Sequence, residues 1–83
     1  MTVAVTLTHA AKKDIDSLPA VAQARVAARI AALSAYPLVS GVKALKGKLK
    51  GQFRIRVGDY RIVFTVATNS LTIVAIDDRK DAY

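Results

Sequence analysis

The chain has 83 residues, of which thirteen are Lys or Arg, six are acidic and none is Cys, so its formal net charge is +7. This length allows one small domain with a single core, and the lack of cysteine excludes a disulfide framework or a thiolate metal site. No apolar run approaches the ~18 residues of a membrane span, and no signal-peptide pattern is present. We therefore expect residues 1–83 to form one cytoplasmic domain. Its charge favours a polyanion, namely nucleic acid, an anionic membrane surface or an acidic protein segment, and of these we do not expect a membrane as the partner.

The first predicted elements are a strand and a short helix. Hydrophobic residues alternate over residues 3–7, which is typical of a strand. Thr8 is expected to cap the following helix, because its hydroxyl can accept a hydrogen bond from a backbone N–H of the first turn. In that helix Ala11, Ile15 and Leu18 recur at helical spacing and should face the core.

A longer, alanine-rich helix is predicted between Pro19 and Pro37. Pro19 suits its first turn, whereas Pro37 ends it and biases Tyr36 toward an extended backbone. Arg25 and Arg29 lie four residues apart and outside the apolar stripe. They are interpreted as surface charge, with the lining of a partner groove as the alternative. The apolar stripe consists of Ala22, Val26, Ile30 and Leu33.

Lysines accumulate in a segment between Gly41 and Gly51 that is expected to form a loop. Asp59 is the only acidic residue between Lys43 and Arg61, so the positive charge is clustered along the chain. Clustered cations attract phosphate groups without reading base identity. We predict this role for Lys43, Lys46, Lys48 and Lys50.

The segment QFRIRVGDYRIVF, residues 52–64, predicts a β-hairpin with a two-residue turn at Gly58 and Asp59. This register places Arg56 opposite Arg61, and directly opposed residues share a face of the sheet. The core face would then consist of Phe53, Ile55, Val57, Tyr60, Ile62 and Phe64. The second face would carry Arg54, Arg56 and Arg61, continued by Val63 and Thr65.

The arginines of the second face have two interpretations. A solvated face is common in antiparallel sheets, but like charges that oppose each other across strands are destabilising. The alternative is an anion site, since guanidinium groups donate forked hydrogen bonds to phosphate oxygens. We favour the anion site because the central positions of this face hold no acidic residue.

After a turn at residues 67–70, a last strand is predicted over residues 71–78. Its register is open, because both alternating sets of residues in the strand are apolar. A four-residue loop leaves Arg79 on the core face. A three-residue loop, or a bulge, instead places Asp77 and Arg79 beside Arg61.

The predicted order is an N-terminal strand, two helices that form a hairpin, and an antiparallel meander of three strands. Helices that are segregated from the sheet in this way predict a two-layer α+β fold with the helices packed on one face. The sequence contains no P-loop, no paired His-Glu metal motif and no Ser-His-Asp set. We therefore expect neither a metal nor a cofactor.

The motifs LKG, FRIRVGDYRIVF and IDDRKDAY, in this order and spacing, resemble the RelE/ParE superfamily of toxins from bacterial type II toxin–antitoxin systems. The resemblance covers nearly the whole chain. It implies a RelE-like fold and, for RelE-like members, a ribosome-dependent mRNA endoribonuclease that inhibits translation. In that reaction a 2′-hydroxyl attacks the adjacent phosphate, and the products are a 2′,3′-cyclic phosphate and a 5′-hydroxyl, with no metal required.

The resemblance also implies the roles of five catalytic residues. Arg54 and Arg56 match basic residues that contact the phosphate and assist proton removal. Arg61 matches the arginine that stabilises the pentavalent transition state, and Arg79 matches the arginine proposed to help the leaving oxygen. Tyr83 matches the tyrosine that stacks on a base or orients the 2′-hydroxyl.

Two other functions remain open at this point. A ParE-like toxin of the same fold would inhibit DNA gyrase without cutting RNA, and a basic binding module would only grip nucleic acid. For either toxin we expect a cognate acidic antitoxin, partly disordered on its own, that folds onto this domain in a hetero-oligomer. The RelE-like toxin would also have the ribosome and mRNA as partners.

Overall fold

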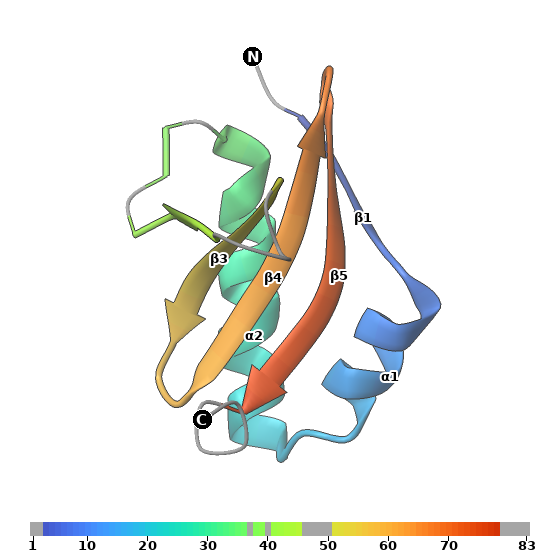
Figure 1. The fold of residues 1–83 in the computed structure, drawn as a ribbon. Helices are drawn as coiled ribbons and strands as arrows, with labels where there is room; N and C mark the ends of the chain where they lie inside the picture. Colours follow the sequence, from blue (N-terminus) through green and yellow to red (C-terminus); the bar gives the residue numbers. More distant parts are fainter. Residues whose placement is uncertain (1–2, 37, 40, 46–50, 79–83) are drawn as a thin grey trace.

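The computed structural model describes residues 3–36, 38–39, 41–45 and 51–78. Its five-stranded sheet has the order β1-β5-β4-β3-β2, in which β1 is parallel to β5 and the other neighbours are antiparallel (Figure 1). The elements in chain order are β1 (Ala4–Leu7), α1 (His9–Asp16), α2 (Ala20–Ala32), the short 3-10 helix η1 (Leu33–Ala35), β2 (Lys43–Ala44), β3 (Gln52–Val57), β4 (Tyr60–Ala67) and β5 (Ser70–Asp78).

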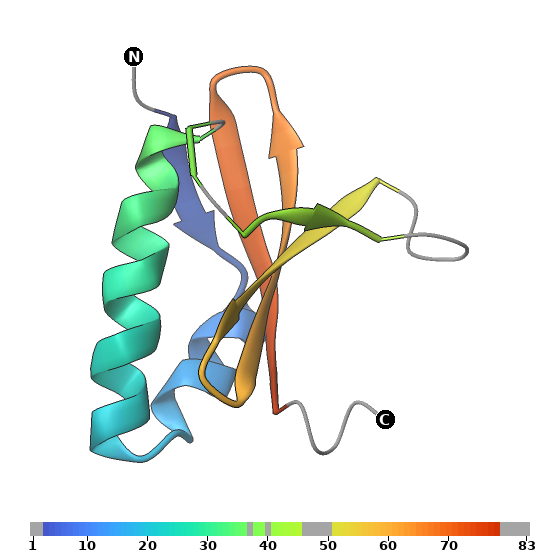
Figure 2. The ribbon, with the colours of Figure 1, turned by 90° about the vertical axis from the view of Figure 1, so that its left-hand side faces the viewer.

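The helices and the sheet form two layers. In Figure 2 the helix α2 runs along one side of the strands, and Figure 1 shows α1 beside β5. This arrangement confirms the predicted α+β class with helices packed against the sheet. The buried core between the layers consists of Ala11, Val26, Ile30, Leu33, Ile55, Ile62, Phe64, Leu71, Ile73 and Ile76.

The first helix begins where the sequence predicts it. The Thr8 hydroxyl oxygen accepts a hydrogen bond from the Ala11 N–H at 3.1 Å, which satisfies a donor that has no partner within the helix. Because α1 ends at Asp16, Leu18 follows the helix instead of continuing its stripe, although it still packs against the core. Pro19 is the N-cap of α2 and so precedes its first turn.

The apolar stripe of α2 is buried as predicted at Val26, Ile30 and Leu33. The helix tightens into η1 before Tyr36, whose ψ of 137° is extended, as expected for a residue that precedes a proline. The Tyr36 ring meets the Phe64 ring edge-on, with 6.2 Å between centroids. The end of the helix is therefore anchored to the middle of the sheet.

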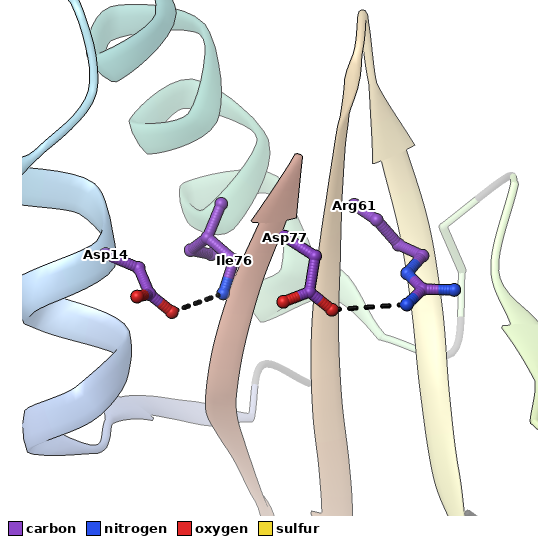
Figure 3. A network of polar contacts seen from close by, with 4 residues as sticks. All are labelled: Asp14, Arg61, Ile76 and Asp77. Atoms are coloured by element: carbon purple, nitrogen blue, oxygen red, sulfur yellow. Dashed lines mark hydrogen bonds and ion pairs between the residues drawn. The ribbon is translucent and has the colours of Figure 1, made fainter. Parts of the chain in front are cut away.

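β1 covers only the first part of β5, and α1 covers the next part. β1 pairs with β5 as far as Ile73. Beyond that point the Thr8 hydroxyl donates to the Val74 carbonyl at 3.3 Å, and the Asp14 carboxylate accepts from the Ile76 N–H at 3.0 Å (Figure 3). Side chains of the helix and its cap thus replace the hydrogen bonds that β1 does not supply.

The glycine-rich segment, which was expected to be only a loop, contains the short strand β2. Lys43 pairs with Arg54 and Ala44 pairs with Phe53. Two residues are too few to give an alternating pattern, so the sequence could not reveal this strand. It extends the sheet by one strand and brings Lys43 to the face that carries Arg54.

Candidate functional site

Cationic residues gather on one face of the sheet. β3 and β4 pair in the predicted register, which places Arg56 opposite Arg61 and Arg54 opposite Val63. β2 places Lys43 opposite Arg54, and directly opposed residues share a face. We call Lys43, Arg54, Arg56 and Arg61 the arginine face.

Arg61 is held by Asp77 of β5. The Arg61 Nη2 donates to the Asp77 Oδ2 at 3.2 Å, and 17% of the Arg61 side chain and 40% of the Asp77 side chain are exposed (Figure 3). Because Arg56 opposes Arg61 and Arg61 opposes Asp77, two cations and one anion form a row across three strands. The carboxylate offsets part of the repulsion between the arginines and fixes one guanidinium in place.

A β-bulge at Val74 in β5 brings Asp77 opposite Arg61. The extra residue shifts the alternation by one position, so Ile73 and Ile76 are both buried. The bulge alternative is therefore confirmed for Asp77. The four-residue loop is wrong, because only two residues separate β4 from β5.

The described residues include part of the predicted site. Arg54, Arg56, Arg61 and Lys43 lie on one face, as their strand pairing shows. Their functional roles stay predictions. The remaining expected site residues lie outside the described part of the chain, namely Lys46, Lys48, Lys50, Arg79 and Tyr83.

A cavity of about 260 Å³ opens at the edge of β3, near the start of β2. Arg29 of α2 reaches it, a residue that was interpreted as surface charge with the lining of a partner groove as the alternative, and that was not among the predicted site residues. A Cβ added at Gly41 would lie 3.5 Å from the Arg29 Nη2, so the guanidinium lies close to this glycine. We call this the basic cavity, and it is lined by Arg29, Gly41, Lys43, Arg54, Ile55 and Arg56.

A second cavity, also of about 260 Å³, lies between the start of α2 and the turn from β3 to β4. It is largely apolar, and its charged residues have opposite signs, since it contains Arg25 and Asp59. Val21, with 69% of its surface exposed, lies at this cavity. We call it the turn cavity, and it is lined by Pro19, Val21, Ala22, Arg25, Val57, Gly58, Asp59 and Tyr60.

The described ranges offer few other candidate sites. Within them no group of three or more His, Cys, Asp or Glu residues lies close enough together to hold a metal ion. His9 is exposed at the first position of α1. No helix in these ranges is long and apolar enough to cross a membrane.

Residues 5–83 match the model of a protein family described as the ParE toxin of type II toxin–antitoxin systems. The chain belongs to the ParE toxin family. This membership confirms the resemblance to the RelE/ParE superfamily that the motifs predicted. The protein is therefore a toxin of the type II class, with the RelE/ParE fold.

Solved structures of other toxins are similar to this ParE-family toxin. The toxin–antitoxin complex RelBE2 from Mycobacterium tuberculosis has a TM-score of 0.85 and 29% identity, over 95% of this chain and 93% of that chain. The RelE–RelB complex from Pyrococcus horikoshii has a TM-score of 0.79 and 26% identity, over 95% and 97% of the chains. The YoeB/ParE toxin from Agrobacterium tumefaciens shares the fold at 17% identity, with a TM-score of 0.75 over 92% and 98%. No protein of curated function matches the chain.

The arginine face and the basic cavity of this toxin are continuous. Arg54 and Arg56 belong to both, and Lys43 also lines the cavity. Guanidinium and ammonium groups that are held close together bind oxyanions, because they offer several charged hydrogen-bond donors at once. These cationic residues therefore form one continuous positively charged surface.

Proposed function

We propose that this toxin is a ribosome-dependent mRNA endoribonuclease whose arginine face binds the phosphate that is cut. The observation that carries the proposal is the direct opposition of Arg56 and Arg61, with Arg54 and Lys43 on the same face. Such a pair of like charges opposes folding. A bound phosphodiester removes this repulsion, because its oxygens accept hydrogen bonds from both guanidinium groups.

The reaction implied for RelE-like toxins fits this charge distribution. The 2′-oxygen forms a bond to phosphorus and the bond between phosphorus and the 5′-oxygen breaks. Solvent water takes the proton of the 2′-hydroxyl, and water supplies the proton that the leaving 5′-oxygen gains. Negative charge grows on the phosphorane oxygens, and Arg56 and Arg61 stabilise it more than they stabilise the ground state. A guanidinium group keeps its proton in proteins. These arginines therefore stabilise charge and do not act as general bases.

Asp77 acts on this reaction through Arg61. Its carboxylate accepts the hydrogen bond from Arg61 Nη2, so the guanidinium is already oriented before the substrate arrives. Less side-chain freedom is then lost when a phosphate binds. Asp77 is a positioning residue in this scheme, and Arg61 contacts the reacting group.

A second protein is expected to control the toxin. The similar structures from Mycobacterium tuberculosis, Pyrococcus horikoshii and Methanococcus jannaschii are toxin–antitoxin complexes. A net charge of +7 favours an acidic partner, and we infer a cognate antitoxin that binds the toxin in a hetero-oligomer. If a small acidic protein encoded beside it is the antitoxin, co-expression with that protein should restore growth and give a complex that co-purifies. Failure of every such neighbour to do either contradicts the inference.

Induced expression followed by primer extension on a translated reporter mRNA tests the nuclease. The wild type should give discrete cuts within the translated region, and Arg61→Ala should lower the cleavage rate by about 10²–10³. Arg25→Ala is the matched control, because it removes the same charge from an exposed position on α2. This control should cut like the wild type. Equal cleavage by the two variants would remove Arg61 from the mechanism.

The family match favours one alternative, since its description is that of the ParE toxin. A ParE-like toxin would inhibit DNA gyrase and leave RNA intact. Growth arrest with uncut mRNA, together with inhibition of supercoiling by purified gyrase, would select this function. If neither cleavage nor growth arrest occurs, the arginines only grip nucleic acid, and Arg61→Ala should weaken RNA binding modestly and reduce its salt dependence.

A further inference from the structure

We propose that the basic cavity is a second phosphate site, which holds the phosphodiester next to the one that is cut. The inference rests on the proposed function in one respect, namely that the ligand is an RNA strand lying across the arginine face. Its own basis is a set of four cationic residues around one cavity. Arg29, which belongs to this set, takes no part in the site predicted from the motifs.

Three separate elements bring the cations to the cavity. Arg29 comes from the helix layer, Lys43 from β2, and Arg54 and Arg56 from β3. Within the described residues β2 pairs with β3 only at Arg54 and the residue before it, so the edge of β3 beyond Arg54 has no strand neighbour among them. Ile55, which is fully buried, forms the apolar part of the lining. The cavity therefore reaches from the arginine face around the edge of the sheet toward α2.

The charge of the lining selects an anion. Among the residues that the structure describes, the charged ones in the lining are Arg29, Lys43, Arg54 and Arg56, and none of these lining residues is acidic. The turn cavity has the same volume, but there Arg25 shares the lining with Asp59. Because each water takes about 30 Å³ in the liquid, a cavity of about 260 Å³ has room for a phosphate group and several waters.

Because the cavity is continuous with the arginine face, a nucleic acid strand fits it better than an anion with a single charged group. Arg54 and Arg56 line the cavity and also lie on the face that carries Arg61. An anion in the cavity is thus adjacent to the phosphate that these arginines bind during cleavage. A ribonucleotide chain carries a phosphate at every residue and can fill both positions at once, with forked hydrogen bonds to each.

Arg25 and Arg29 provide a matched pair for the test. They lie one helical turn apart on α2, and substitution of either by alanine lowers the net charge by one, but only Arg29 lines the basic cavity. The affinity for a short, uncleavable 2′-O-methyl oligonucleotide would be measured for the purified toxin and for both variants, across a range of salt concentrations. Inorganic phosphate would be titrated in parallel while the backbone amide resonances of Gly41 and Ile55 are followed.

Arg29→Ala should raise the Kd for the oligonucleotide about tenfold, because a charge-assisted hydrogen bond to phosphate is lost. The slope of log Kd against log salt should fall by about one. Arg25→Ala should change the Kd less than about twofold, as an exposed charge away from the ligand does. Phosphate should shift the Gly41 and Ile55 resonances saturably in the wild type and in Arg25→Ala, but not in Arg29→Ala.

Other outcomes overturn the proposal. Equal losses in the two variants mean that only overall charge matters, and a shift that persists in Arg29→Ala excludes this arginine from the site. Tighter binding of a polyglutamate peptide of the same net charge assigns the cavity to an acidic protein instead. If Arg29→Ala does not fold, Lys43→Ala tests the same cavity from an exposed strand position.

Cleavage assays on the same variants separate this inference from the nuclease proposal. If the wild type cuts mRNA and Arg29→Ala binds and cuts equally well, the second phosphate site is wrong and the nuclease stands. If the wild type does not cut mRNA, but the binding of phosphate and of the oligonucleotide still depends on Arg29 and not on Arg25, the second phosphate site stands and the nuclease proposal fails.

Discussion

One strand register fixes both faces of the β3–β4 hairpin, but one face stabilises the fold and the other destabilises it. On the core face Ile55 lies opposite Ile62, and both are fully buried. On the arginine face Arg56 lies opposite Arg61, a pairing that favours the unfolded chain. Because successive side chains of a strand point to opposite faces, neither face can form without the other. The comparison teaches that the core face supplies the free energy that holds the charges of the other face in place.

The largest expected effect lies on the core face. Phe64 is fully buried, and its ring stacks on Phe53 with 5.9 Å between centroids. Phe64→Ala should lower the free energy of unfolding by about 3–5 kcal/mol, because a cavity replaces the ring. Urea denaturation measures this loss. Val21→Ala is the control at an exposed apolar position and should cost less than about 0.5 kcal/mol, so equal losses would contradict the assignment of the core.

A smaller effect is expected where α1 meets the edge of the sheet. Asp14→Ala leaves the Ile76 N–H without its side-chain acceptor, which should cost about 1–3 kcal/mol of unfolding free energy. The Ile76 amide should also exchange its hydrogen faster. Asp16→Ala removes the same charge from an exposed position of the same helix and should leave that amide protected. Unchanged exchange in Asp14→Ala would refute the role of this carboxylate.

The ion pair on the arginine face should contribute little to stability. Asp77→Asn removes the charge that faces Arg61, and a partly exposed pair of this kind is worth about 0–1 kcal/mol. The loss, measured by urea denaturation, should shrink in high salt. Asp59→Asn in the hairpin turn is the control for the change in net charge. A loss well above that of a partly exposed pair would show that the arginine face is part of the stabilising structure.

The smallest predicted effect has the opposite sign. Arg56→Thr removes the like charge opposite Arg61 and should raise the unfolding free energy by about 0.2–1 kcal/mol, while cleavage of mRNA falls. Arg56→Lys keeps the charge and should show no such gain. Thermal unfolding at low and high salt measures the difference, which should vanish as salt screens the repulsion. A destabilised Arg56→Thr variant would mean that the arginine row is not under repulsion.

The hairpin could be predicted from the sequence residue by residue, whereas the last strand could not. In β3 Arg54 and Arg56 alternate with large apolar residues, and in β4 Arg61 lies between Tyr60 and Ile62, so a shift of the register by one position would bury charge. In β5 Val74 and Ile76 are as apolar as Ile73. Because of the bulge at Val74, Ile73 and Ile76 both face the core, although they belong to different alternating sets of the strand. Hydrophobic pattern alone does not indicate where an extra residue is inserted.

The parts of the site that were missed depend on contacts between distant segments. Nothing near Arg29 in the sequence shows that its guanidinium reaches Gly41, since α2 and the segment before β2 meet only in the folded chain. The same holds for Asp14, which accepts a hydrogen bond from a backbone 62 positions away. Helical periodicity places each residue on a surface of its helix. It does not identify the segment that lies against that surface.

The position of β5 in the sheet has a consequence for the order of events during synthesis. β5 lies between β1 and β4, yet it is made after all the other strands of the described residues. The first strand therefore has no strand to pair with until residues 70–73 have been translated. Arg61 likewise meets Asp77 only at that late stage. Because these pairings join residues that are far apart in the sequence, the arginine face takes its final arrangement only after β5 has been made.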